Sequence, residues 1–416
     1  MKNSCQNLSP HINANIISET APQADSEAAS GVTRLLLNNF RSYKSFTLSC
    51  SSKPMVITGP NGSGKTNILE ALSFLSPGRG FRQAKLTDVL RRAENSQDTV
   101  SISNENYTNT WAVSCTLTTP YGDLDLGTGL AITPGESEKR RVRIQKEDVK
   151  SQTSLGDYVS IHWLTPQMDR IFVDGVTARR RFLDRLVYNL DPSHAGRVMR
   201  YEHVMRERLK ILKTGGIHQD RWLSTLETKM AESGVSIAVA REQTIQSLMQ
   251  AKSQALGIFP KAILSMDGHT ESRLKTASAL DVEDELKKSL RQSRRQDAES
   301  GRTNVGPHRS ELSVLYAEKN QFAEQCSTGE QKALLISIIM AAARLQSLKG
   351  DQVPLLLLDE VVAHLDHNRR DCLFEEIMNL GIQAWMTGTD EAVFQGIFPH
   401  AQHLHYNGQQ FETLSR

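Results

Sequence analysis

The sequence predicts an α/β fold, a mixed sheet with covering helices, that is interrupted by an inserted and mainly helical arm domain. Three observations predict it. A short apolar strand at residues 55–58 runs into a glycine-rich turn and then a helix from residue 67. A second apolar strand at residues 355–358 ends in two carboxylates. Between these two strands, residues 178–295 follow a helical pattern punctuated by Gly and Pro.

The pattern along the chain divides it into four parts. Residues 1–31 are rich in Ser, Asn, Ala and Gln with few large apolar residues, so we expect a disordered tail there. Residues 32–177 form the N-terminal half of the predicted α/β head, and residues 178–300 form the helical arm. Residues 301–416 return to alternating strands and helices and form the second half of the head.

The first half of the head begins with predicted strands at residues 34–37 and 46–48, before the strand at 55–58. From residue 96 to residue 150, polar and apolar residues alternate in segments such as 111–117. We expect these segments to be exposed antiparallel strands.

The overall composition limits the class of protein. The formal net charge is only +2, so a surface that binds nucleic acid must come from local clusters of basic residues. None of the five cysteines forms a Cys-x-x-Cys pair, which argues against a disulfide framework or a zinc site and suits a reducing cytosol. The longest apolar run, residues 333–343, is too short to span a bilayer. We therefore expect a cytoplasmic protein without a membrane partner.

A phosphate-binding loop is predicted directly after the strand at residues 55–58. The pattern G-x-x-x-x-G-K-[ST] is matched by Gly59, Pro60, Asn61, Gly62, Ser63, Gly64, Lys65 and Thr66. Glycines let successive backbone N–H groups turn toward phosphate oxygens, and the following helix adds a favourable dipole. Lys65 is expected to reach the β- and γ-phosphates, and the Thr66 hydroxyl to ligate Mg²⁺. The strand before the loop and the helix after it argue against a chance match.

The strand at residues 355–358 supplies the acidic half of the predicted site. It looks like a Walker B strand, because it places Asp359 and Glu360 at its carboxyl end, where α/β sheets bind ligands. Asp359 is expected to hold Mg²⁺, directly or through water, and Glu360 to polarise the attacking water as general base. The alternative is a buried strand that ends in a solvated acidic turn, and the phosphate loop makes that interpretation the weaker one.

Residues 326–331, with the sequence CSTGEQ, resemble the signature motif of the ABC ATPases and precede an apolar helix. The motif lies 32 residues before Asp359 (359 − 327), in the expected order. The resemblance implies that Ser327 and Gly329 grip the γ-phosphate of ATP held by the other subunit and so complete its catalytic site. Taken alone, the motif also fits a plain helix cap with Glu330 in the first turn.

The spacing of the motifs indicates the branch of the ABC ATPases, and four further sequence motifs indicate the family. Lys65 and Asp359 are 294 residues apart (359 − 65), much farther than in transporter ATPases, and an inserted arm is typical of the SMC-like branch. This arm lacks long heptad runs, so it is not an extended coiled coil. Four segments, in order along the chain, resemble motifs of the RecF family: residues 39–43 (NFRSY), 78–82 (GRGFR), 179–184 (RRRFLD) and 306–309 (GPHR). The resemblance covers nearly the whole chain from Val32 onward.

Resemblance to the RecF family implies a function. ATP and Mg²⁺ would close two ABC-type heads into a homodimer, DNA would lie across the closed dimer, and hydrolysis would release it. The family acts in recombinational DNA repair and replication at gaps, with RecR and RecO, to support RecA loading and the SOS response. Single- and double-stranded DNA would be bound with little sequence preference. A structural DNA clamp of the SMC kind and a transporter subunit are the rival interpretations, which would require a long coiled coil and a compact head respectively.

Two departures from the family pattern concern the hydrolysis machinery. Residues 166–169 (PQMD) stand where the family has P-E-D, and either Gln167 or Asp169 could take the Q-loop role. The strand at residues 384–387 is followed by Gly-Thr-Asp, with no switch-loop histidine, so we expect a slow ATPase.

Arginines form the candidate DNA contacts, because they would meet a line of phosphates and bind through counterion release. The alternative for each arginine is a solvated helix face or an ion pair with a nearby acid. The strongest candidates are Arg179, Arg180, Arg181, Arg294 and Arg295, and further clusters contain Arg140, Arg141, Arg185 and Arg291.

Overall fold

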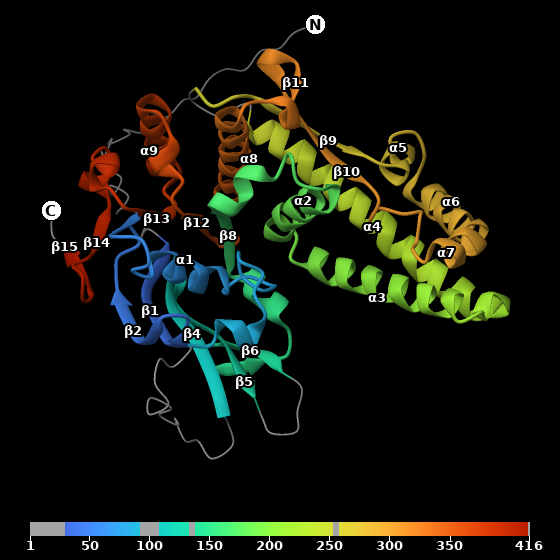
Figure 1. The fold of residues 1–416 in the computed structure, drawn as a ribbon, viewed down its shortest axis with the longest axis horizontal. Helices are drawn as coiled ribbons and strands as arrows, with labels where there is room; N and C mark the ends of the chain where they lie inside the picture. The colour runs from blue at the N-terminus through green and yellow to red at the C-terminus, as the bar shows by residue number, and fades with distance from the viewer. Residues whose placement is uncertain (1–29, 92–107, 133–137, 253–257, 415–416) are drawn as a thin grey trace, which may run out of the picture.

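The computed structural model describes residues 30–91, 108–132, 138–252 and 258–414 (Figure 1). The tail expected to be disordered lies outside these residues, apart from its last two positions. The first element of the described residues is strand β1, which begins at Gly31, one residue before the predicted start of the head. Within the described residues, no helix is long and apolar enough to cross a membrane.

A six-stranded sheet in the order β15-β14-β3-β13-β12-β8 forms the centre of the head. Strands β14 to β8 are parallel to their neighbours, and β15 is antiparallel to β14. The inner strands are almost wholly buried, as parallel strands covered on both faces are. The strands are β3 (Met55–Thr58), β8 (Val159–Leu164), β12 (Val353–Leu358), β13 (Gln383–Gly388), β14 (Gln402–Tyr406) and β15 (Phe411–Leu414). The predicted strands 55–58, 355–358 and 384–387 are therefore confirmed.

A second, antiparallel sheet has the order β2-β1-β4-β5-β6-β7. The prediction for residues 111–117 is right in topology and wrong in exposure, because the side chains of Trp111, Val113, Cys115 and Leu117 are buried. Alternate residues of this strand face the core while the others face outward. The strands are β1 (Gly31–Phe40), β2 (Tyr43–Ser49), β4 (Thr108–Thr119), β5 (Gly122–Ile132), β6 (Lys139–Ile144) and β7 (Glu147–Val149).

Helix α1 (Lys65–Ser73) contacts both sheets, through β1 and β13. At its C-terminal end, the ring of Phe74 packs edge-on against Phe40 and Trp111, at centroid distances of 5.9 and 5.1 Å. Burial of α1 between the sheets explains why seven of its nine residues are buried, including Lys65 and Glu70. The helix that follows the phosphate loop is thus held by the core on more than one side.

The arm projects to one side of the head in Figure 1 and is built mainly from helices. Its own core contains Tyr201, Val204, Met230, Leu286 and Leu290. The helices of the insertion are α2 (Val176–Leu190), α3 (Ser193–Lys213), α4 (Asp220–Lys252), α5 (His269–Leu274), α6 (Ala279–Gln292) and α7 (Arg294–Ser300).

One strand interrupts the segment that was expected to be helical. Strand β9 (Ala262–Asp267) pairs antiparallel with β10 (Glu311–Tyr316), which pairs with β11 (Gln321–Phe322). Its alternating burial is the two-residue period of a strand. The helical prediction is wrong here, because six residues are too few for the period to stand out beside long helices.

Two long helices complete the second half of the head: α8 (Thr328–Lys349) and α9 (His367–Leu380). Helix α8 packs on β8 and β12 of the parallel sheet and on α4 of the arm. Short 3₁₀ helices form several connections: η1 (Leu86–Val89), η2 (Gln152–Asp157), η3 (Pro166–Arg170), η4 (Gly216–His218), η5 (Ala317–Lys319), η6 (Ala323–Gln325), η7 (Val362–His364), η8 (Glu391–Phe394) and η9 (Phe398–His400).

Candidate nucleotide-binding site

The predicted phosphate loop connects the carboxyl end of β3 to the first residue of α1. Gly62 and Gly64 have φ angles of 84° and 98°, which L-residues rarely adopt. A Cβ at Gly64 would lie 2.6 Å from the Tyr43 hydroxyl oxygen, so glycine is required there on two grounds. The buried Ser63 hydroxyl has no hydrogen-bond partner among the described residues. An unpaired buried hydroxyl in a glycine-rich turn at a helix N-terminus fits a loop that receives phosphate oxygens.

The Lys65 side chain is buried and folds back over this loop. Its Nζ donates hydrogen bonds to the carbonyl oxygens of Gly59 and Pro60, at 2.7 and 2.8 Å. Burial lowers the pKa of Lys65 below its ordinary value, and the nearby carboxylates of Glu360 and Asp359 act in the opposite direction. The loop and the acidic residues therefore belong to one electrostatic site.

Asp359, directly after β12, links β13 to the first turn of α1. Its Oδ1 accepts hydrogen bonds from the hydroxyls of Thr66, at 2.9 Å, and Thr387, at 2.8 Å. Burial raises the pKa of Asp359, Glu360 raises it further, and the two threonine hydroxyls oppose the shift. A partly desolvated carboxylate beside a threonine hydroxyl is an oxygen ligand set of the kind that Mg²⁺ prefers.

Glu360 follows Asp359 in a strained backbone conformation. Its φ of 55° is uncommon for a residue with a side chain, and such strain tends to concentrate at functional sites. Its N–H donates to the Thr387 hydroxyl, at 3.0 Å. Thr387 was not among the predicted site residues, although its place at the end of the predicted strand 384–387 was a usable signal.

The signature residues lie at the N-terminus of α8. Ser327 caps that helix: its hydroxyl accepts from the Glu330 N–H, and the Glu330 carboxylate accepts from the Ser327 N–H, which forms a capping box. Hydrogen bonds from Lys319 and Ser327 lower the pKa of Glu330 to about 2. Ser327 and Gly329 are exposed, and nothing lies within 4 Å of a Cβ built on Gly329. The predicted helix cap is thus confirmed. The exposed positions of Ser327 and Gly329 are also compatible with contact to a second subunit.

Two of the sequence landmarks meet at Glu70, a fully buried residue of α1. Arg41, from the segment 39–43, donates to both carboxylate oxygens at 2.6 and 2.9 Å. Arg82, from the segment 78–82, donates to Glu70 Oε2 at 2.9 Å and to Asn67 Oδ1 at 3.0 Å. These arginines hold the helix behind the phosphate loop, because a buried carboxylate requires paired donors.

The other two landmarks meet at the root of the arm. Asp184 accepts two hydrogen bonds from the Arg241 guanidinium, at 2.8 and 2.9 Å, and a third from His194 Nε2, at 2.9 Å. Burial raises the pKa of Asp184, but Arg241 and His194 outweigh it and bring that pKa to about 2. Arg241 also donates to the carbonyl oxygen of Pro307, from the segment 306–309. The landmarks thus join α2, α4 and the segment that returns to the head.

The residues expected to assist hydrolysis are placed as follows. Gln167 is exposed, and Asp169 pairs with Lys332 of α8 at 3.4 Å. Both remain candidates for the Q-loop role.

The candidate DNA contacts do not form one surface. Arg179 is buried, donates to the carbonyls of Phe172 and Asp174 and pairs with Glu311. Arg294 is also buried and pairs with Glu227 and Asp220, both at 2.6 Å. The structure does not support these two as phosphate contacts, because their guanidinium groups already satisfy buried acids and carbonyls.

Other arginines remain accessible. Arg181 is exposed, Arg180 is half-buried and donates to the Ser310 carbonyl at 2.8 Å, and Arg295 is exposed and pairs with Glu299 four residues on. Figure 1 places α7, which carries Arg295, well along the arm from α2. Arg140 donates to the carbonyls of Phe74, Ser76 and Gly78, so it is a structural residue.

Comparison with known proteins agrees with this head and site. A family model described as the RecF/RecN/SMC N terminal domain matches residues 31–399. The chain therefore belongs to the RecF/RecN/SMC class of proteins. Two solved structures of the recombination mediator protein RecF, RecF-ATP and RecF-ATPrS, share this fold with TM-scores of 0.77 and 0.76 at 20% sequence identity. They cover 94% of this chain and 100% and 99% of their own.

Closer relatives narrow the class to one family. The chain is 42% identical over 379 residues to the DNA replication and repair protein RecF of Mesorhizobium japonicum, covering 91% of this chain and 96% of the relative. It is 44% identical over 385 residues to the protein of the same name in Brucella abortus, covering 92% and 96%. Agrobacterium fabrum has a third such relative, 43% identical over 373 residues, covering 89% and 95%. The chain is a member of the RecF family.

Proposed function

We propose that this chain is an ATP-dependent DNA-binding protein of DNA replication and recombinational repair. The proposal rests on residues that meet at the carboxyl ends of neighbouring parallel strands. Lys65 lies in the loop-to-helix turn after β3, and Asp359 and Glu360 follow β12. Thr387, on the strand between them, bonds to both acidic residues. This is the edge at which α/β sheets bind ligands. Membership of the RecF family supports the biological role.

Each residue of the site has a proposed task. The loop from Gly59 to Thr66 holds the triphosphate of ATP, with Lys65 on its β- and γ-phosphates. Thr66 and Asp359 hold Mg²⁺, which neutralises phosphate charge when bound. Glu360 accepts a proton from the attacking water as general base. Turnover is slow, because the segment after β13 brings no histidine to the γ-phosphate.

ATP binding drives two heads together. Ser327 and Gly329 lie exposed at the N-terminus of α8, where a helix dipole and free N–H groups attract an anion. They complete the partner subunit's site in a homodimer, and hydrolysis lets the dimer open.

DNA is bound through its backbone. Arg180, Arg181 and Arg295 remain as phosphate contacts after the buried arginines are excluded, and contacts to phosphates carry no direct sequence information. Single- and double-stranded DNA at gaps is the substrate, and RecR and RecO are the protein partners with which the chain supports RecA loading and SOS induction. The packed arm, with helices α3 and α4 side by side, does not favour the rival clamp with a long coiled coil.

Sedimentation of the full chain, with and without ATP and a gapped DNA, tests the proposal. The wild type should dimerise only with ATP, while Lys65→Ala should stay monomeric. DNA affinity should fall steeply with salt, by about 0.9 log unit per log unit of salt for each phosphate contacted in duplex DNA. Dimerisation without nucleotide, or DNA affinity that ignores salt, would contradict the proposal.

A further inference from the structure

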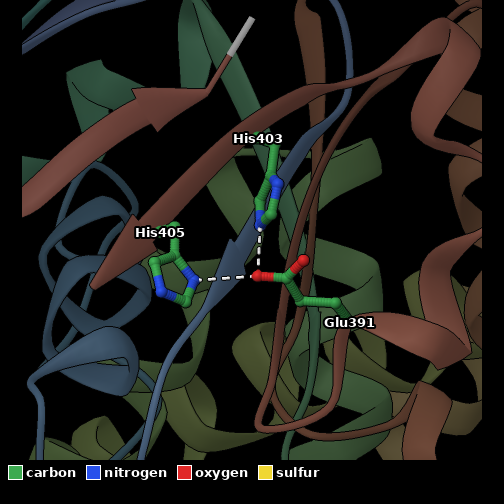
Figure 2. Close-up of side chains that lie close together, drawn as sticks. All are labelled: Glu391, His403 and His405. Atoms are coloured by element: carbon green, nitrogen blue, oxygen red, sulfur yellow. Dashed lines mark ion pairs between the residues drawn. The ribbon is translucent and has the colours of Figure 1, made fainter. Parts of the chain in front are cut away.

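A compact group of metal-ligating side chains lies beside the phosphate loop. His403 and His405 are two residues apart on β14, so their side chains lie on the same face of the sheet. Glu391, the first residue of η8, reaches the same point from the segment that follows β13 (Figure 2). Glu391 Oε1 lies 2.9 Å from His405 Nδ1 and 3.7 Å from His403 Nε2.

We propose that Glu391, His403 and His405 form a binding site for one divalent transition-metal ion of the zinc class. One ligand atom from each residue lies within 4.8 Å of the other two. Ligands about 2.1 Å from a tetrahedral zinc ion stand about 3.4 Å apart, which falls between the two separations to Glu391 Oε1. Two imidazoles and one carboxylate suit Zn²⁺ and its neighbours, whereas the oxygen-only pair Thr66 and Asp359 suits Mg²⁺. The site uses no cysteine, so the scattered cysteines of the sequence do not bear on it.

The Thr58 hydroxyl oxygen adds a fourth polar atom to the two imidazole nitrogens and the carboxylate oxygen of the group. Its hydroxyl lies 2.7 Å from His403 Nε2, 2.9 Å from His405 Nδ1 and 3.4 Å from Glu391 Oε1. Without a metal, these contacts form a hydrogen-bond network that keeps the three ligand atoms turned toward one point. A cation at that point would exchange these hydrogen bonds for coordination, with the Thr58 hydroxyl next to it.

The surroundings provide both rigidity and access. The His403 side chain is only 1% exposed, and its ring packs against Phe398 at a centroid distance of 4.7 Å. His405 and Glu391 are 32% and 31% exposed, so an ion can enter from solvent. Thr58 immediately precedes Gly59, the first residue of the phosphate loop, so an ion here would brace β14 against the strand that carries the loop.

Isothermal titration calorimetry, with Zn²⁺ added to the full-length, chelator-treated protein, tests this inference. One saturable equivalent is expected in the wild type. His405→Gln and Glu391→Gln should each weaken its binding by at least about tenfold. His400→Gln is the matched control, because His400 is an exposed residue of η9 three positions before His403 and outside the group. It should bind Zn²⁺ as the wild type does.

Binding of Co²⁺ to the wild type supplies a readout that requires no variant. A bound Co²⁺ with nitrogen and oxygen ligands in a four-coordinate shell should show intense visible absorption, which Zn²⁺ displaces. Circular dichroism confirms that each variant is folded. The inference is overturned if neither ion binds saturably, which would leave a hydrogen-bond network only. It is also overturned if Zn²⁺ binding survives in both His405→Gln and Glu391→Gln.

Discussion

Replacement of Ser327 by arginine separates the two roles of the signature serine. Within its own chain, Ser327 caps α8, and across the proposed dimer it faces the partner's nucleotide. The variant loses the bond that the hydroxyl accepts from the Glu330 N–H but keeps the bond that the Ser327 N–H donates to the Glu330 carboxylate. Loss of a serine cap costs about 1 kcal/mol, so the melting temperature should fall by only about 1 °C in a protein of this size.

The effect on dimerisation should be far larger. A long cation at an exposed helix N-terminus blocks the approach of a second head, while the phosphate loop of the same chain stays whole. Ser327→Arg should therefore bind ATP as a monomer with normal affinity and fail to dimerise. Ser327→Ala is the matched control, because it removes the same cap without adding bulk. It loses one hydrogen bond to a charged group in each of the two sites of the dimer, about 3–6 kcal/mol in all, so it should dimerise about 10²- to 10⁴-fold more weakly but still form the dimer at raised protein concentration.

Three measurements decide the outcome: thermal unfolding, equilibrium ATP binding, and sedimentation velocity with ATP. Equal melting temperatures for Ser327→Arg and Ser327→Ala, with dimerisation lost only in the former, would support the trans-acting signature. A Ser327→Arg protein that still dimerises with ATP, or that loses ATP affinity as a monomer, would refute it and leave Ser327 as a cap. Mixing Ser327→Arg with Lys65→Ala should restore partial closure, because one of the two sites in that heterodimer is intact.

Three further predictions concern the same site. Lys65→Ala should lose ATP affinity yet keep its circular dichroism spectrum, and wild-type affinity in an equilibrium binding assay would remove the phosphate-loop assignment. Glu360→Gln should bind ATP and accumulate as a dimer, with single-turnover hydrolysis slowed by about 100-fold or more, the range attributed to a positioned base; unchanged turnover would mean another residue is the base. Asp359→Asn should raise the melting temperature of the nucleotide-free protein at pH 7, because the raised pKa of Asp359 means that its ionised form is disfavoured in the fold. The gain in melting temperature should shrink as the pH falls through the raised pKa, where the wild-type carboxyl becomes protonated. The same variant should lose Mg²⁺-dependent ATP binding. A lower melting temperature than the wild type at pH 7 would count against the burial argument.

Local patterns were sufficient for the centre of the head. The strand at residues 355–358 is entirely apolar and ends in two acids, and the phosphate loop has a fixed spacing, so neither depends on distant partners. Strand β9 is different, because only its pairing with β10 distinguishes six alternating residues from a helical turn. The partners of Arg179 and Arg294 were equally hidden, since Glu311 and Glu227 lie 132 and 67 residues away along the chain.

The group around Thr58 shows the same limit at the level of a site. His403 and His405 are visible as an alternating pair in the sequence, but nothing local indicates that β14 lies beside β3. Glu391 joins them only because the chain turns through η8 after β13. Sites that are assembled by sheet order therefore require the topology, whereas sites built on one loop do not.

Helix α4 is a single rod shared by two cores. Leu226 and Met230 near its beginning belong to the core of the arm, while Ile245 and Leu248 near its end belong to the core of the head. Its 33 residues span about 50 Å without a break, and the one glycine inside it, Gly234, is closely surrounded by Leu286, Tyr201 and Pro307. The arm consequently has no flexible joint along this helix. A load applied at the far end of the arm would tilt α4 as a lever, and its contact with α8 would carry that tilt to the helix that presents Ser327.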